Sequence, residues 1–459
     1  MLAHAAAALL ALSLGQAVGS RGRPDLPPVV PQGTQSPVTP GTPVEAPPPA
    51  PAVGPSAGTN NDLAGPAGVP FMPTVGRPAE DLRGVFLDAA LLTQVRTRSL
   101  NESGGSTTWG TDLEVTPGLA LEVNTADLSL SVGYAPRFTV PFESGGLQLA
   151  ILSRATLRAD WRVDPLWLVQ ALGVFVFGDY SQLVPASTPG GAGPVPPVIN
   201  PVRSFQTYPY VGIDTLLRVE GTLSPRARLR LQGGYFDVGG TGAVGQANQP
   251  RAWGPQGEAA FSWDLSPRAS LVTTVGAQDW IMSNQVFVVI ATATESWRQV
   301  WTPELETTFG VGAGYSNREV ESATAAGKVV PVAKGSLVYQ TTSRQPLRLG
   351  VDVALAPYFD TYVQMPYQRV TLTALLDWRP SDAWGVGASF AGALAPYTVR
   401  APESYATTGV SASYAPLPFL ILTLGGFLQS QFQGTDFSVV NFQQWTGYVS
   451  IALRDRFQF

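Results

Sequence analysis

The residues of this sequence that could do chemistry are charged side chains that recur at every second position of apolar segments. In residues 226–235, for example, Arg228 and Arg230 alternate with Leu229 and Leu231. Alternate side chains of a β-strand lie on the same face of the sheet, so such a segment has one polar face and one apolar face. A wet face that carries charges of both signs can hydrogen-bond a polar solute. The pattern therefore predicts contact with a solute rather than a reaction.

Eleven charged residues fall on the polar face when this two-residue period is followed along the chain. We predict that the following residues line the inside of a pore: Arg154, Arg158, Asp160, Asp214, Arg218, Glu220, Arg228, Arg230, Arg348, Asp352 and Asp377. Because both signs are mixed, the predicted pore is not strongly selective for charge. Two interpretations stay open: ordinary ion-paired wall residues, or a hydrated track for a polar or polymeric solute.

The composition excludes several kinds of site. The chain has no cysteine, and its only histidine is His4. Thiol catalysis, cysteine-ligated metals, and general catalysis by histidine are thereby excluded from the rest of the chain. The net charge of −5 gives no basis for binding nucleic acid. We therefore predict no enzyme, no catalytic residue, no metal site, no cofactor and no nucleic-acid partner.

The elements that must position the charged residues are β-strands. Residues 127–134, 369–378 and 418–432 repeat the alternation of apolar with small or polar side chains. A soluble β-sandwich would bury the apolar face, whereas a membrane barrel would turn it to lipid and keep the polar face inside. Alternation alone does not separate these two folds. The connections, the aromatic residues and the last strand favour the barrel.

Short and long connections alternate along the chain, as in barrels with short periplasmic turns and longer outer loops. The predicted short turns are residues 124–127, 163–165, 224–226, 266–268, 301–303, 342–346, 379–382 and 415–418. The predicted long loops include residues 184–204, 239–252 and 316–335. Residues 279–284 must serve as an unusually short outer connection. With a first strand from Gly84 and a last strand near the C-terminus, the count is about 18 strands, within a range of 16–20.

Aromatic residues form two groups, which predict the two interfacial girdles of a membrane barrel. The tryptophans beside short turns are Trp161, Trp167, Trp263, Trp297, Trp301, Trp378 and Trp384. The tyrosines near the opposite strand ends are Tyr134, Tyr180, Tyr235, Tyr315, Tyr358 and Tyr397. Each residue alone would indicate only packing, so the signal is their shared position.

The last strand has one apolar face that ends in a phenylalanine. The residues of this face are Val449, Ile451, Leu453, Phe457 and Phe459. Asp455 interrupts the alternation at a place where the membrane interface would tolerate a charge. We predict that Phe459 is an assembly signal for the machinery that inserts outer-membrane barrels.

The N-terminal part of the chain differs in composition from the rest. Residues 5–14 are apolar and are followed by small residues, which predicts a secretory signal peptide over residues 1–19. Residues 20–80 are rich in proline, glycine and alanine, and we expect a disordered periplasmic linker there. The predicted barrel covers residues 81–459. The fold class is thus all-β: a transmembrane antiparallel up-and-down β-barrel with a disordered N-terminal arm.

One segment carries a resemblance to a known family. Residues 112–138, with the sequence VTPGL at 115–119 and the strand at 128–136, resemble myxobacterial-type exopolysaccharide-export barrels of the outer membrane. The resemblance implies an exit channel for a polysaccharide. It also implies a periplasmic polysaccharide-export protein as a partner, one that lacks a membrane span of its own.

Our leading hypothesis is an outer-membrane channel that passes a hydrophilic polymer, exopolysaccharide, out of the cell. A general diffusion porin for small hydrophilic solutes is the first alternative. The second is an outer-membrane enzyme or adhesin that acts through its loops. All three place the chain in contact with outer-membrane lipid.

Overall fold

The computed structural model describes residues 83–102, 107–142, 149–181, 207–248, 250–320, 323–341, 345–360, 364–394, 404–433 and 436–459. The expected signal peptide and linker, residues 1–80, lie outside this range. The described residues form eighteen strands and one short helix. In chain order these are β1 (Gly84–Glu102), β2 (Thr108–Asn124), β3 (Leu128–Pro141), β4 (Ala150–Asp164), β5 (Trp167–Ser181), β6 (Thr207–Ser224), β7 (Ala227–Gly240), α2 (Gly242–Asn248), β8 (Ala252–Ser266), β9 (Ala269–Met282), β10 (Val286–Thr302), β11 (Leu305–Val320), β12 (Ala323–Gln340), β13 (Leu347–Asp360), β14 (Met365–Ser381), β15 (Trp384–Leu394), β16 (Ser404–Leu417), β17 (Leu420–Gln433) and β18 (Asp436–Gln458).

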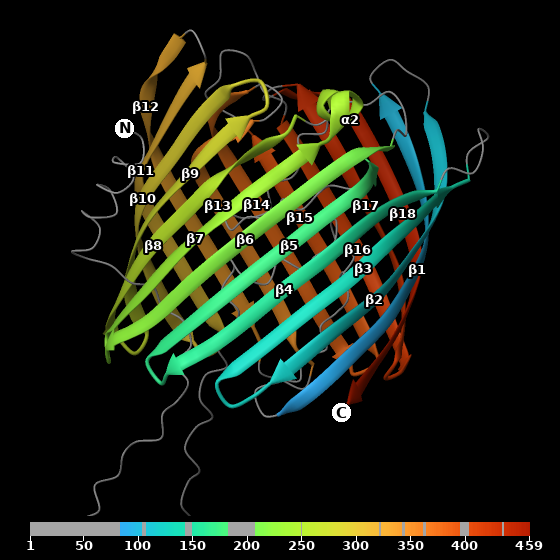
Figure 1. Ribbon diagram of the computed structural model, residues 1–459, viewed down its shortest axis with the longest axis horizontal. Helices are drawn as coiled ribbons and strands as arrows, with labels where there is room; N and C mark the ends of the chain where they lie inside the picture. Colours follow the sequence, from blue (N-terminus) through green and yellow to red (C-terminus); the bar gives the residue numbers. More distant parts are fainter. Residues whose placement is uncertain are drawn as a thin grey trace, which may run out of the picture.

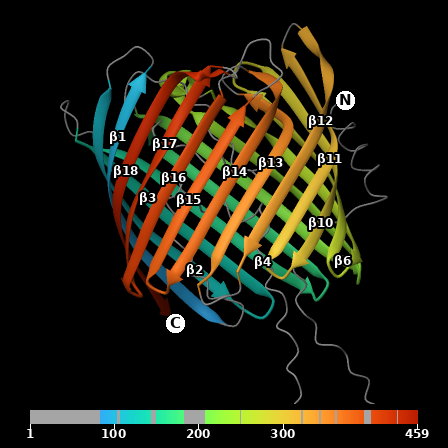
Figure 2. The same cartoon turned by 180° about the vertical axis from the view of Figure 1, so that it is seen from behind.

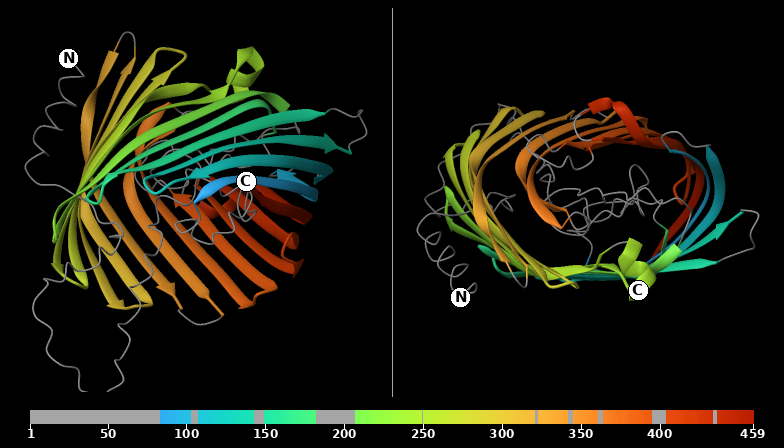
Figure 3. Two further views of the ribbon diagram at one scale, coloured as in Figure 1. Left: turned by 60° about the horizontal axis from the view of Figure 1, so that its bottom comes forward. Right: turned by 90° about the horizontal axis from the view of Figure 1, so that it is seen from above.

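The strands form one closed antiparallel sheet. Each strand pairs with the next in the chain, and β1 pairs with both β2 and β18 (Figures 1 and 2). Seen from above, the strands make a complete ring (Figure 3). Closure satisfies the backbone groups that an edge strand would leave open, which is the condition for a sheet in lipid. The predicted up-and-down barrel of 18 strands is confirmed.

The two faces of the sheet differ in polarity, as β1 illustrates. Leu91 and Val95 are exposed, whereas Gln94, Arg96 and Arg98 are buried. Side chains converge on the concave inner side of a closed sheet and diverge on the convex outer side. The exposed apolar residues therefore lie outside and the polar residues inside. A continuous apolar exterior of this kind needs lipid around it.

Short turns connect the strands at one end of the barrel, as predicted. Between β4 and β5, Asp164 accepts hydrogen bonds at Oδ1 from the N–H groups of Leu166 and Trp167, at 2.6 and 2.9 Å. Between β10 and β11, the Thr302 hydroxyl accepts from the N–H of Leu305 at 3.1 Å. Side chains that hydrogen-bond to backbone N–H groups of their own turn stabilise a tight reversal of the chain. The C-terminus lies at this end, and α2 lies at the other (Figure 1).

One of the long-loop predictions was wrong. Residues 316–335 are not a loop, because β11 and β12 stay paired as far as Val320 and Ala323. Their hairpin rises above the neighbouring strands in Figure 1. Alanine, glycine and lysine have little strand propensity, but pairing with β11 overrides that preference. The long connection predicted at residues 239–252 is present, because β7 ends at Gly240 and β8 begins at Ala252, and it contains the seven-residue helix α2.

The other connections agree with the sequence where they are described. The short outer connection predicted at residues 279–284 is a turn of three residues, Ser283 to Gln285, between β9 and β10. The predicted loop at residues 184–204 lies outside the described residues. In the described part of the chain, no helix is long and apolar enough to span a membrane.

Most of the predicted girdle residues lie on the outer surface. Six of the seven tryptophans have exposed fractions between 42% and 57%: Trp161, Trp263, Trp297, Trp301, Trp378 and Trp384. Trp167 is half-buried. Tyr134, Tyr235 and Tyr315 are also exposed on the outer surface. The side chains of Tyr180 and Tyr397 lie outside what the structure describes.

The assignment of Tyr358 to a girdle was wrong. Its side chain is half-buried, its ring meets that of Tyr367 edge to face, and the Arg369 guanidinium lies over it. Positions 352 and 358 differ by an even number, so Tyr358 shares the polar face with Asp352. The girdle assignment used the distance from the turn and neglected this alternation.

The seam between the first and last strands carries charged contacts on the inner face. Arg456 on β18 pairs with Asp88 on β1 at 3.6 Å and with Glu122 on β2. Its guanidinium carbon lies 4.4 Å from the ring centroid of Phe86. At the end of the seam, the N–H of Phe459 donates to the carbonyl of Val85 at 2.9 Å. One arginine thus ties three strands together where the barrel closes.

Replacing Arg456 with alanine is expected to lower the free energy of unfolding by about 1 kcal/mol, because charged hydrogen bonds at a partly exposed site have that order of strength. Urea titration of the chain folded into phospholipid vesicles would measure the change. Arg226→Ala, in the turn between β6 and β7, is the control and should have no effect. Equal effects from both variants would contradict a role of Arg456 at the seam.

Candidate functional site

A row of hydrogen bonds crosses four neighbouring strands on the inner face. On β4, Arg158 donates to Asp160 at 2.7 Å. Gln170 on β5 donates to the same carboxylate at 2.8 Å. Arg218 on β6 then donates to Gln170 at 3.3 Å and to Gln232 on β7 at 3.1 Å. Charged and amide groups therefore satisfy one another around this part of the wall.

Ion pairs continue the polar wall from β7 to β8. Arg230 donates to Glu258 at 2.5 Å, and Arg228 donates to Asp264 at 2.8 Å. All four side chains are partly exposed. In each pair the two charges offset one another, so the wall here carries no large field of one sign. Pairs that still reach water can exchange partners with a passing polar solute.

A second network, on β1 and β2, is buried. Asp112 is fully buried and accepts hydrogen bonds from Arg98 at 2.8 Å and from Arg96 at 3.2 and 3.3 Å. Arg96 also lies 3.6 Å from Glu114. Charges removed from water must be paired and hydrogen-bonded to persist. This network therefore holds the wall together rather than meeting a solute.

All eleven predicted pore-lining residues fall on the polar face of their strands. The hydrogen-bonded row brings together Arg158, Asp160 and Arg218. Glu220 lies directly across from Arg230, and Arg348 lies directly across from Asp377. The register places the other four on the same face: Arg154, Asp214, Arg228 and Asp352. Among these, Asp214 accepts a hydrogen bond from Gln256 at 3.0 Å.

The sequence interpretation missed two partners of these residues, Glu258 and Asp264, and it also missed Arg96, Arg98 and Arg298 on the same polar face. Arg298 and Glu306 form a bidentate pair at 2.6 and 2.7 Å between β10 and β11. Each missed residue lies on the polar face of an alternating strand, so the same two-residue period could have found it. The two-residue period does not give the register between strands, and this register determines which charged side chains form pairs.

The chemistry open to this wall is hydrogen bonding. Arg158 illustrates it, because 55% of its side chain remains exposed while it pairs with Asp160. Within the described residues, no group of three or more histidine, aspartate or glutamate side chains is placed to hold a metal ion. The wall offers paired donors and acceptors along the inner face of the barrel.

A family model decides what kind of barrel this is. The model of the EpsX exopolysaccharide export family matches residues 84–422, from the first residue of β1 into β17. The chain belongs to the EpsX exopolysaccharide export family. The match covers most of the barrel, so the resemblance expected from residues 112–138 is confirmed. With its apolar exterior and paired polar interior, this EpsX-family barrel is an outer-membrane channel for polysaccharide export.

Solved structures with a similar shape are outer-membrane proteins. OpdK from Pseudomonas aeruginosa, solved with vanillate, is 13% identical to this chain, with a TM-score of 0.41. That alignment covers 81% of this EpsX-family chain and 99% of OpdK. The FrpB iron transporter from Neisseria meningitidis is 9% identical, with a TM-score of 0.44, over 78% of this chain and 64% of its own. These structures are too dissimilar to indicate a solute. No curated protein matches the chain.

Proposed function

We propose that exopolysaccharide leaves the cell through the lumen of this barrel by passage along the polar inner wall, without any catalytic step. The observation that carries the proposal is the match of an exopolysaccharide-export family to almost the whole closed barrel. The paired charges of the wall support it. A pore must bind its solute strongly enough to admit it and weakly enough to release it.

In this proposal, the eleven predicted residues line the path of the polymer. Sugar hydroxyl groups both donate and accept hydrogen bonds, so arginines and carboxylates of the wall can each meet them. Arg158 and Asp160 exemplify the arrangement, since one donates, the other accepts, and both reach water. Because the charges offset one another, neutral and weakly charged polymers can both pass.

The proposal includes a periplasmic partner that delivers the polymer. The short turns form the periplasmic rim, the arrangement usual in outer-membrane barrels. A polysaccharide-export protein without a membrane span of its own would dock at this rim. Contact at the short, rigid turns would leave the opposite end of the barrel free for release.

Deleting the barrel is expected to abolish one surface polysaccharide while uptake of small solutes stays unchanged. The reason is that an export channel is the only exit for a polymer too large for other pores. Quantifying surface polysaccharide and the uptake of a small sugar in wild-type and deletion strains would test this. Complementation with the intact chain is the control.

Two outcomes would reject the proposal. One is a deletion strain that retains every surface polysaccharide. The other is slowed uptake of small hydrophilic solutes with an intact surface coat, which is the phenotype of a lost diffusion porin. Planar bilayers give an independent measurement, because a porin conducts steadily alone, whereas we expect this channel to open with its periplasmic partner.

A further inference from the structure

One hairpin of the barrel leaves the wall. β13 pairs with β12 only as far as Leu355, and β14 pairs with β15 only from Val370 onward. Between these points, β13 and β14 continue to pair with each other up to Asp360 and Met365. We call residues 356–369, apart from 361–363, which the structure does not describe, the inner hairpin. Its described residues are paired along their strands only with each other.

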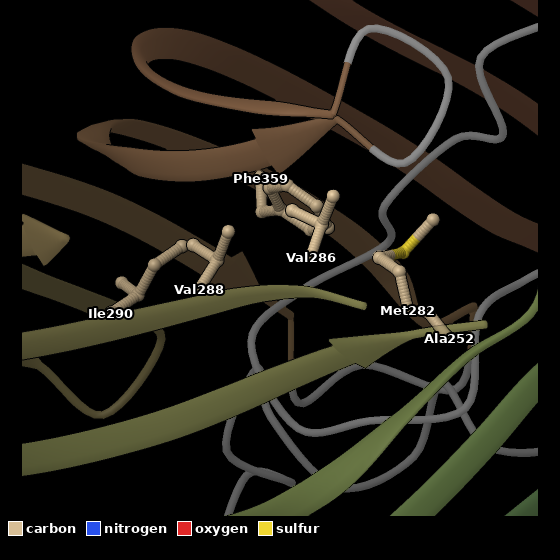
Figure 4. Packing of buried hydrophobic residues seen from close by; sticks show 6 residues of the cluster. All are labelled: Ala252, Met282, Val286, Val288, Ile290 and Phe359. Atoms are coloured by element: carbon tan, nitrogen blue, oxygen red, sulfur yellow. The ribbon is translucent and has the colours of Figure 1, made fainter. Parts of the chain in front are cut away.

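The inner hairpin folds over the inner face of the wall. Phe359 is 1% exposed and packs with Met282, Val286 and Val288 (Figure 4). Phe287 lies between the two valines and is exposed on the outer surface. Strand alternation therefore turns Val286 and Val288 into the barrel. Phe359 reaches them from inside the lumen.

Further contacts fix the hairpin to the wall. The ring of Trp280 lies 5.4 Å from that of Phe359. Gln368 donates from Nε2 to the carbonyl of Pro331 on β12 at 2.6 Å. Asn284, in the turn between β9 and β10, donates to Gln364 at 2.8 Å. One apolar contact and two hydrogen bonds thus hold the hairpin across β9 to β12.

The opposite face of the hairpin looks into the lumen. Phe359 and Gln368 face the wall, so their strand neighbours Tyr358, Tyr367 and Arg369 face away from it. The rings of Tyr358 and Tyr367 are 5.5 Å apart and inclined at 68°. The guanidinium carbon of Arg369 lies 3.4 Å from the centroid of the Tyr358 ring. Both tyrosines are half-buried, so each keeps part of its surface accessible, whereas Arg369 is 7% exposed.

We propose that Tyr358 and Tyr367, with the buried Arg369 packed against the Tyr358 ring, form a contact site for pyranose rings of the exported glycan. The inference rests on the proposed function, because it places the site in the path of the polymer. The C–H faces of a pyranose ring are apolar and stack on aromatic rings. Elsewhere the polar wall offers hydrogen bonds, and this site adds the aromatic surface that distinguishes a sugar from water.

The test uses two substitutions that keep the hairpin on the wall. Tyr358→Leu with Tyr367→Leu preserves apolar volume and removes both aromatic faces, and Phe359 still packs behind them. The purified chain is studied in a detergent without a sugar headgroup, with maltohexaose as the probe. Saturation-transfer NMR measures binding. We expect the apparent affinity of the double variant to fall at least tenfold.

Two matched variants complete the design. Tyr358→Phe with Tyr367→Phe keeps the aromatic faces and should bind within about twofold of wild type. Tyr235→Leu removes an exposed tyrosine from the outer surface and should not change binding. No saturation transfer from wild type to maltohexaose, or equal transfer from wild type and from the leucine double variant, would overturn the site.

Export itself is measured separately from binding. Suppose that the leucine variant restores full surface polysaccharide to the deletion strain and binds maltohexaose like wild type. The export proposal is then supported and the proposed sugar site is rejected. Suppose instead that the variant no longer binds maltohexaose while the deletion strain keeps every surface polysaccharide. The sugar site is then supported and the export proposal is rejected.

Discussion

Asp112→Asn is expected to destabilise the barrel by about 3 kcal/mol, the order observed when one member of a buried ion pair is removed. Asp112 is fully buried and accepts hydrogen bonds from both Arg96 and Arg98. The amide that replaces it carries no charge. The two arginines would then remain buried with one negative charge fewer beside them; the Glu114 carboxylate lies 3.6 Å from Arg96. Urea unfolding in phospholipid vesicles would measure the loss.

The matched control is Asp160→Asn on β4. Asp160 also pairs with an arginine, but 55% of the Arg158 side chain is exposed. Water can solvate that arginine when its partner is neutral, so we expect a loss below about 1 kcal/mol. A comparable loss from both variants would mean that the β1–β2 network is not shielded from water.

Leu217→Arg should lower the free energy of unfolding by about 2–4 kcal/mol, because it places a charge in lipid near the middle of the membrane. Leu217 is 54% exposed and lies in the central part of β6. Folding efficiency into vesicles and urea titration would both report the change. The heat-resistant folded band on gels should weaken in parallel.

The adjacent residue gives the control for this experiment. Leu216 precedes Leu217 on the same strand, so its side chain points to the opposite, inner face. Leu216→Arg places the same charge on a wet wall and should cost well under half as much. If Leu216→Arg were the more damaging variant, the inside and outside of the barrel would have to be exchanged.

Much of the fold could be predicted from the sequence because the alternation of polar and apolar residues within one strand already distinguishes its two faces. Arg228 and Arg230 alternate with leucines, and that local pattern already determines which side is wet. Turn residues such as Asp164 and Pro165 act within two or three positions of themselves, so they also mark their turns without tertiary information.

Contacts between strands far apart in the sheet could not be predicted. The two-residue period puts Tyr358 on the inner face, but nothing in it indicates that β13 leaves β12 after Leu355. That departure depends on Phe359 finding the apolar patch around Val286 and Val288. The same limit explains the hairpin of β11 and β12, whose composition resembles a loop until its partner strand is known.

The seam between β1 and β18 has a consequence for the order of events during biogenesis. Glu102 ends the first strand and Asp436 begins the last, so the ribosome must add more than 300 residues between them. At ordinary rates of synthesis this interval is roughly 20–70 s. Throughout it, the apolar residues of β1 have neither their partner strand β18 nor lipid to cover them. The nascent chain therefore needs a chaperone that keeps it unfolded until it reaches the membrane. A chain that ended before β18 would form a sheet with two open edges and would aggregate.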